Sequence, residues 1–292
     1  MFTGAIGSVS GNSLDVAAAA GNEAIAGAMT GEIPWFIEVI SGDNEGHRFE
    51  VDELNSTATA IVIEAPHALN TLATIPASLA ADRIALRPHW TLAEWLPPSN
   101  FRATNSSGTA DRLGFYTGTT FTYHWLFANA GNPKWVNDAA LTNRGTRVMD
   151  PAEALLIQPR STSAPVFVNL GVVRAHKFAC PIKQGTRLIG GGWPMDQSFT
   201  SRNMLYANGF TGGTSSSRAD RIQIWTGDST PGGAVYDSHY LLKTATLQQW
   251  VRVGDAALAN ENNLSLFKFM RGVYFNSIAG KPDYVAPTPW TP

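Results

Sequence analysis

Two copies of an Ala-Asp-Arg triplet are the most prominent residues that could do chemistry. Ala110-Asp111-Arg112 and Ala219-Asp220-Arg221 each precede an apolar segment typical of a strand, and Ala81-Asp82-Arg83 is a third instance. A carboxylate beside a guanidinium could bind a polar ligand. An Asp at such a position also commonly accepts hydrogen bonds from turn amides, and an Arg there covers neighbouring apolar surface. Because the triplet is repeated, we favour the scaffold role.

The histidines form no catalytic or metal-binding pattern. His124 and His239 are equivalent in the two copies of the repeat described below, so we interpret both as packing or hydrogen-bonding residues. The other histidines are scattered and lack the spacing of a zinc site. They are His47, His67, His89 and His176. We therefore predict no metal site and no cofactor.

No segment predicts nucleophilic or acid–base catalysis. A GxSxG elbow is absent, and the Gly/Ser-rich residues 212–217 lack the lysine of a phosphate-binding loop. Glu50, Asp52 and Glu53 fall on a hairpin that we expect to be solvated, whereas a glycosidase needs two opposed carboxylates in a cleft. We predict no catalytic residues and no enzyme, with a hydrolase as a minor alternative.

The composition narrows the class of protein. Charged residues make up only 15% of the chain, the net charge is −2, and no Lys/Arg block occurs, which argues against binding nucleic acid through charge. Cys180 is the single cysteine, so no intramolecular disulfide can form. No apolar stretch is long enough for a transmembrane helix, and the first residues lack a basic, then apolar, export signal. Low charge suits an extracellular or assembled β protein.

The chain contains an internal repeat centred on residues 101–118 and 210–227. The Ala-Asp-Arg blocks match at a constant offset, and the match resumes after a short insertion around residues 231–233. Trp135-Val136 then corresponds to Trp250-Val251. An offset interrupted only at turn-rich positions indicates tandem supersecondary units.

The pattern of short strands and turns predicts an all-β fold with short helical turns only. We expect an N-terminal β-meander domain over residues 1–90, followed by two sandwich-like or barrel-like repeats over residues 91–173 and 174–280. Residues 281–292 contain four prolines and predict an extended arm with polyproline character.

The nine tryptophans divide into two predicted groups. We expect the strand residues Trp125, Trp135, Trp225 and Trp250 to be core. Trp95 and Trp193 stand near Pro or Gly in predicted loops and are the candidate exposed platforms for a ligand such as a sugar.

Several segments resemble an uncharacterised family of secreted repeat proteins found mainly in Verrucomicrobia. They are residues 2–12, 40–49, 87–92 and 192–194 and the repeated Ala-Asp-Arg blocks. The resemblance covers nearly the whole chain. It implies secretion and a β fold, and it transfers no site residues because the family has no assigned activity.

These observations favour a non-enzymatic structural protein of the extracellular space or cell surface that self-assembles into a surface layer or filament. Tyr284, Val285 and Trp290 of the C-terminal arm are the candidate contacts with a neighbouring subunit. The alternative is a secreted glycan-binding protein that uses Trp95 and Trp193.

Overall fold

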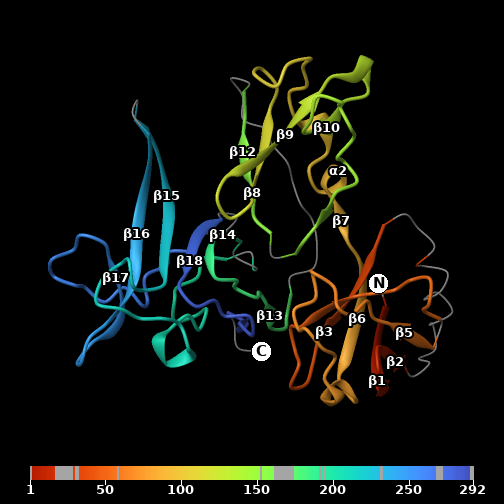
Figure 1. Cartoon of the computed structure of the whole chain (residues 1–292), viewed down its shortest axis with the longest axis horizontal. Helices are drawn as coiled ribbons and strands as arrows, with labels where there is room; N and C mark the ends of the chain where they lie inside the picture. Colours follow the sequence, from red (N-terminus) through yellow and green to blue (C-terminus); the bar gives the residue numbers. More distant parts are fainter. Residues whose placement is uncertain are drawn as a thin grey trace.

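The computed structural model describes residues 2–16, 29, 33–57, 59–151, 153–160, 174–190, 193, 195–230, 233–267 and 272–289. Antiparallel sheets dominate this part of the chain, which confirms the all-β prediction. Its helices are single turns: α2 (Leu92–Trp95), η2 (Ala77–Leu79), η3 (Pro98–Asn100), η4 (Asn129–Gly131) and η5 (Tyr206–Asn208). Among the described residues, no helix has the length and hydropathy needed to cross a membrane. Three lobes are visible, each built around one of the larger sheets (Figure 1).

The N-terminal unit (residues 2–88) contains a six-stranded sheet with the order β4-β3-β6-β1-β2-β5. Its strands are β1 (Phe2–Ser10), β2 (Ser13–Val16), β3 (Trp35–Val39), β4 (Arg48–Glu50), β5 (Ala60–Val62) and β6 (Arg83–Pro88). Apolar residues that alternate along these strands form its core, including Ile37, Phe49 and Ile61. The order is more mixed than a meander because β6 lies between β3 and β1.

The middle unit (residues 90–158) contains a four-stranded sheet with the order β10-β9-β8-β12. Its strands are β8 (Arg112–Tyr116), β9 (Phe121–Phe127), β10 (Lys134–Val136) and β12 (Leu156–Gln158). The short strands β7 (Trp90–Thr91) and β11 (Val148–Met149) pair beside it. Trp135 is fully buried in the core, and its indole N–H donates to the carbonyl of Leu96 at 3.1 Å.

The C-terminal unit (residues 178–286) contains a five-stranded sheet with the order β14-β18-β15-β16-β17. Its strands are β14 (Gly185–Ile189), β15 (Arg221–Thr230), β16 (Gly233–Lys243), β17 (Gln248–Arg252) and β18 (Val273–Ser277). Trp250 is fully buried, stacks on Phe199 with ring centroids 3.9 Å apart, and donates its indole N–H to Met204 O at 2.6 Å.

The middle and C-terminal sheets share one arrangement. The order β10-β9-β8-β12 has the same connectivity as β17-β16-β15-β18. Buried Asp111 and Asp220 stand immediately before β8 and β15. The Oδ2 atom of Asp111 accepts the Arg102 amide and that of Asp220 accepts the Thr211 amide, both at 2.8 Å. Positions aligned in the sequence therefore occupy equivalent places in the two sheets.

Each of these aspartates also reaches the end of the closing strand. Asp111 Oδ1 accepts the Arg160 amide at 2.5 Å, and Asp220 Oδ1 accepts the Ile278 amide at 2.8 Å. A buried carboxylate with several amide donors ties three chain segments together. The scaffold interpretation of the Asp side chains agrees with these contacts.

The C-terminal segment packs on its own chain. Tyr284 is only 3% exposed, and its hydroxyl donates to Arg202 O at 2.6 Å. Val285 and Ala286 form β19, which pairs with β13 (Phe178–Ala179). The expectation that Tyr284 is a free subunit contact is therefore wrong, because its ring completes the core of the C-terminal unit. Val285 is half-buried in the β13–β19 pair, and Trp290 lies outside the described residues.

The units contact one another through polar and aromatic residues. Glu38 of β3 is fully buried and pairs with Arg87 at 2.9 Å and with Arg174, in the segment before the C-terminal unit, at 2.8 Å. The amide of Ala179 donates to Gly46 O at 3.0 Å, which joins the N-terminal and C-terminal units directly. The middle and C-terminal units meet where Tyr116 packs against Tyr274.

We expect Asp220→Ala to lower the free energy of unfolding by about 3 kcal/mol, because two buried amides would lose their acceptor. Asp220→Asn should cost only about 1 kcal/mol, since one amide oxygen can still accept and burial already opposes the charged form by raising the pKa of Asp220. Urea unfolding followed by tryptophan fluorescence measures both. Exposed Asp43→Ala is the control and should shift stability by less than about 0.5 kcal/mol. Equal effects of the Asn and Ala variants would contradict the assigned role.

Candidate ligand surface

Six aromatic side chains form a continuous row across the middle and C-terminal sheets, which we call the aromatic strip. In spatial order they are Tyr123, Phe121, Tyr116, Tyr274, Tyr236 and Trp225. From Tyr123 to Tyr236, the centroids of successive rings lie 5.3–5.7 Å apart. Tyr236 and Trp225 are direct cross-strand partners.

Strand alternation places the first half of the strip on the outer face of the middle sheet. Leu113 and Phe115 of β8 are buried in the core, so Tyr116 faces the other way. Phe121 of β9 is the cross-strand partner of Tyr116. Gly114 lies beneath these rings. A Cβ there would be 2.9 Å from Phe121 Cδ1 and 3.0 Å from Tyr123 Cε1, so the absence of a side chain makes room for both rings.

The same alternation places the second half on the outer face of the C-terminal sheet. Ile222 of β15 and Phe275 of β18 are fully buried, which turns Trp225 and Tyr274 outward. Tyr236 of β16 pairs with Trp225 in the antiparallel register. The strip is therefore carried by rigid strands rather than by loops.

Tyr274 is the residue at which the two halves meet. Its ring contacts Tyr116 at 5.6 Å, Phe121 at 6.3 Å and Tyr236 at 5.6 Å. Burial, with a further contribution from Tyr236, raises the pKa of Tyr274 above its ordinary value, so the phenol stays neutral. A neutral hydroxyl can both donate and accept hydrogen bonds to a ligand.

Exposure of the strip increases toward Trp225. Its side chain is 46% exposed and Tyr236 is 37% exposed, while the other four rings are half-buried. Polar groups lie on the same outer face: Gln223 is opposite Tyr274, and the Asn276 amide donates to Thr186 Oγ1 at 2.9 Å. Half-buried rings with polar neighbours are suited to ligands that have apolar faces and hydroxyl edges.

The structure corrects the predicted platforms. Trp193 is only 4% exposed and packs against Phe178 with ring centroids 6.1 Å apart, so it is not a platform. Trp95 is half-buried against the core of the middle unit. Trp225, expected in the core, is exposed, and Trp125 is half-buried. The signal for the strip was the alternation of Phe121 and Tyr123 with residues that face the core.

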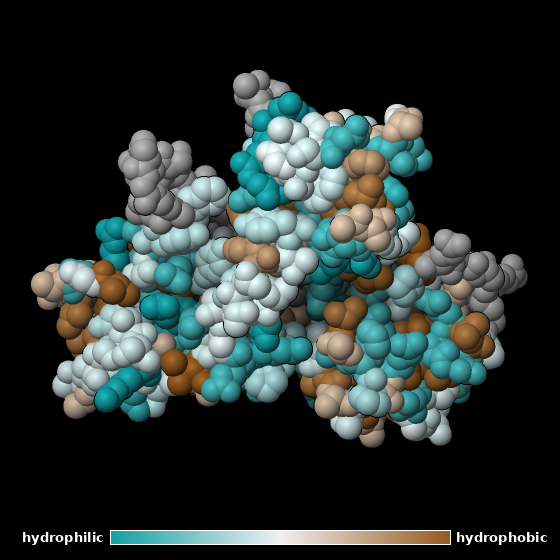
Figure 2. Space-filling view, turned by 45° about the horizontal axis from the view of Figure 1, so that its top comes forward, coloured by the Kyte–Doolittle hydropathy of each residue, from teal (hydrophilic) through white to brown (hydrophobic). Residues whose placement is uncertain are grey.

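On the face shown in Figure 2, strongly hydrophobic residues are scattered among hydrophilic ones rather than gathered into one large patch. Tyrosine and tryptophan are only mildly polar on such a scale. The aromatic strip is therefore better defined by ring contacts than by hydropathy.

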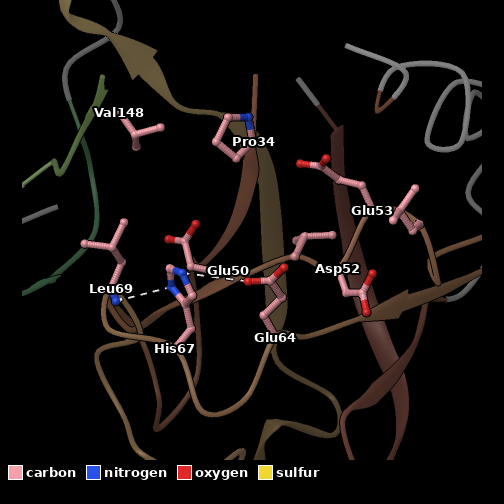
Figure 3. A pocket seen from close by; sticks show the side chains of 10 residues that line it. Pro34, Glu50, Asp52, Glu53, Glu64, His67, Leu69 and Val148 are labelled. Atoms are coloured by element: carbon pink, nitrogen blue, oxygen red, sulfur yellow. Dashed lines mark hydrogen bonds and ion pairs between the residues drawn. The ribbon is translucent and has the colours of Figure 1, made fainter. Parts of the chain in front are cut away.

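Apart from the strip, the N-terminal unit has an acidic cavity of about 380 Å³ (Figure 3). It is lined by Pro34, Glu50, Val51, Asp52, Glu53, Leu54, Glu64, His67, Leu69 and Val148. Glu50 is only 5% exposed, which corrects the expectation of a fully solvated hairpin. Buried His89 lies within hydrogen-bonding distance of Glu50, with its Nε2 2.8 Å from Glu50 Oε2.

The carboxylates of this cavity have different partners and do not converge on one point. Glu53 Oε1 accepts the Trp35 amide at 2.7 Å, and the side chains of Asp52 and Glu53 point away from one another (Figure 3). Burial raises the pKa of Glu53, and the nearby Glu64, Glu50 and Asp52 add to this rise. Within the described part of the chain, no group of three or more His, Cys, Asp or Glu side chains is arranged to hold a metal ion.

The two equivalent histidines differ in their surroundings. His239 Nδ1 pairs with Glu261, whereas His124 packs edge-on against Phe115 with ring centroids 4.8 Å apart. Burial, with smaller contributions from Arg147 and Arg144, lowers the pKa of His124 to about 4. Both contacts lie on the core side of the sheets, away from the strip.

The comparisons with known proteins identified no relative: no family model, no curated protein and no solved structure matches the chain.

We expect His124 to make stability depend on pH. Its pKa is about 4 in the folded chain and about 6.5 when unfolded, so the unfolded state binds the proton first and stability falls as pH drops from 6.5 to 4. Allowing for screening by solvent, the loss is about 2 kcal/mol. His124→Leu should remove this part of the slope in urea unfolding measured across that range, whereas exposed His67→Gln should retain it. An unchanged slope in His124→Leu would contradict the assignment.

Proposed function

We propose that this chain is a non-catalytic extracellular protein that binds a polysaccharide along the aromatic strip. The observation that carries the proposal is the row of six aromatic side chains on the outer faces of two sheets, with Tyr236 and Trp225 exposed at one end. The resemblance to secreted repeat proteins and the low charge of the sequence support an extracellular setting.

The chemistry of the strip suits sugar rings. The C–H face of a pyranose is apolar and packs on an aromatic face, while its hydroxyls need hydrogen-bond partners at the edge. Tyr116, Tyr274 and Tyr236 supply both in one side chain, because a tyrosine has an apolar ring and a polar tip. Tyr and Trp also lose little conformational entropy on binding, since each has only two side-chain torsions. A rigid sheet adds to this pre-organisation.

The length of the strip favours a polymer over a single small molecule. The six rings are distributed over β8, β9, β15, β16 and β18, in two different units. Each ring contributes a modest contact, and a chain of linked sugars engages several at once, so the contributions combine.

We expect the double variant Trp225→Ala/Tyr274→Ala to lose at least about tenfold in affinity for a bound polysaccharide, the loss of roughly 1.4 kcal/mol or more. Affinity electrophoresis in gels that contain soluble polysaccharides measures this retardation directly. Trp90→Ala is the matched control, because Trp90 is 62% exposed and lies on β7, outside the strip. If the control lost as much affinity as the double variant, the strip would not be the binding site.

Self-assembly into a surface layer or filament is the second proposal. Its support is the exposed Leu54, which is 97% exposed at a turn beside the acidic cavity. Two features that could pair with a strand of another subunit already have partners in this chain. The C-terminal segment pairs as β19 with β13. At the outer edges of β10 and β17, Trp135 O accepts the Arg144 amide and Trp250 O accepts the Glu261 amide. Assembly through side chains is therefore favoured over assembly through open edges.

We expect Leu54→Ser to reduce self-association, measured as mass by light scattering over a concentration series, by severalfold in the association constant. Leu264→Ser is the control, because Leu264 is also an exposed leucine, at 49%, but lies in the C-terminal unit. A wild-type chain that stays monomeric at every concentration would exclude this second function.

A further inference from the structure

Three half-buried arginines near the aromatic strip have no carboxylate partner among the described residues: Arg112, Arg187 and Arg221. The Nε atom of each is buried and donates no hydrogen bond within that part of the chain. Other half-buried arginines do have partners: Arg144 pairs with Asp138, and Arg147 pairs with Glu153. Unpaired guanidinium groups are costly unless they meet solvent or an anion.

Arg112 lies directly at the middle-unit end of the strip. Its guanidinium sits over the ring of Tyr123, 5.5 Å from the ring centroid. On β8 it shares the outer face with Gly114 and Tyr116, because side chains two residues apart point the same way. Stacking on Tyr123 holds the planar group in place while leaving its N–H donors for a ligand.

Arg221 occupies the equivalent position at the start of β15. Its cross-strand partners are Tyr240 on β16 and Asn276 on β18. It precedes Gln223 and Trp225 on the same outer face of the strand, at a spacing of roughly 7 Å per pair of residues. The second arginine therefore lies beside the C-terminal half of the strip.

Arg187 of β14 differs from the other two arginines, because it is the cross-strand partner of buried Phe275 and leaves its strand on the core face. Only its guanidinium reaches the junction between the two halves. Its Nη1 is 3.5 Å from the position that a Cβ would take at Gly118, in the turn between β8 and β9. That turn follows Tyr116, whose hydroxyl donates to Gly118 O at 3.0 Å and whose ring contacts Tyr274. The guanidinium thus stands where the middle and C-terminal units meet.

We propose that the ligand of the aromatic strip is an acidic polysaccharide, whose carboxylate or sulfate groups pair with Arg112 and Arg221 on the outer face while its sugar rings pack on the aromatic side chains. This inference rests on the proposed function and specifies its substrate class. Charge complementarity carries it: the unpaired arginines border the strip, and guanidinium groups bind planar carboxylates and sulfates through paired N–H donors.

A single-stranded nucleic acid also combines rings with negative charge. It carries one phosphate per nucleotide and is usually bound in a groove rich in positive charge. This chain has a net charge of −2 and, among the described residues, two unpaired arginines on the outer face beside the strip. A sugar chain with widely spaced acidic groups matches these few arginines better than a nucleic acid with a phosphate on every nucleotide. Binding of nucleic acid is therefore kept as one outcome of the test.

The test compares polygalacturonate with its fully methyl-esterified form, which has the same backbone without the charge, using the intact chain in affinity electrophoresis and calorimetry. Chondroitin sulfate distinguishes sulfate from carboxylate, and oligothymidylate represents nucleic acid. We expect tighter binding of an acidic polymer than of the neutral form, and about tenfold weaker binding when sodium chloride rises from about 50 to about 500 mM.

Arg112→Gln and Arg221→Gln should each weaken binding of the acidic polymer about fivefold and leave binding of the neutral form unchanged. Arg83→Gln is the control, because it removes the same charge from an exposed position on β6 of the N-terminal unit. Thermal melting confirms that the variants remain folded. Rescue by Arg→Lys should be partial, since Lys keeps the charge but not the paired donors.

The outcomes separate the two proposals. Equal, salt-independent binding of acidic and neutral polymers would overturn the charge inference and leave the proposed function standing. Failure to bind any polysaccharide would overturn both. Tighter binding of oligothymidylate than of either acidic polysaccharide would replace the glycan with a nucleic acid as the ligand.

Discussion

The fold depends on buried aspartates that stand immediately before strands. Asp111 and Asp220 each accept amides from the preceding loop and from the segment after the closing strand, in a nearly solvent-free setting. Asp82 plays a related part before β6, where it accepts the Asn44 side-chain amide at 2.9 Å. In each case the carboxylate accepts hydrogen bonds from another segment of the chain, so losing it affects more than one segment at once.

These anchors also determine which residues face outward. A strand whose first residue is fixed cannot slip by one position, because a slip would move its apolar side chains from the core to the surface. With Asp111 and Asp220 held, Leu113 and Ile222 face the cores, and Tyr116 and Trp225 face away. The aromatic strip is thus a consequence of the register of both sheets. Its continuity needs one further contact, the packing of Tyr116 on Tyr274 across the two units.

Residue patterns predict much of the fold but only part of the candidate ligand surface. The all-β class follows from alternation and turn residues, and buried Trp135 and Trp250 follow from their place in apolar strand segments. The prediction for Trp193 is wrong because neighbouring Gly and Pro indicate a loop but not whether other residues cover it. The prediction for Tyr284 is wrong for a related reason: prolines indicate an extended segment, yet that segment pairs with β13 and fills a core. Contacts between residues far apart in the sequence, such as Glu50 with His89, leave no local pattern.

The division of each sheet into a core face and an outer face explains how two sheets of the same arrangement present an aromatic strip that neither sheet has alone. Aligned core positions keep their chemistry: Leu113 corresponds to Ile222, and Trp135 to Trp250. Several aligned outer positions do not: Gly114 corresponds to Gln223, Tyr123 to Ser238 and Leu156 to Tyr274. Substitutions at these three pairs of positions cost little stability, because the packing of Leu113 and Ile222 in the cores does not depend on them. The outer faces are therefore free to differ, and joining two different faces through Tyr274 yields a longer and more varied surface than either sheet presents by itself.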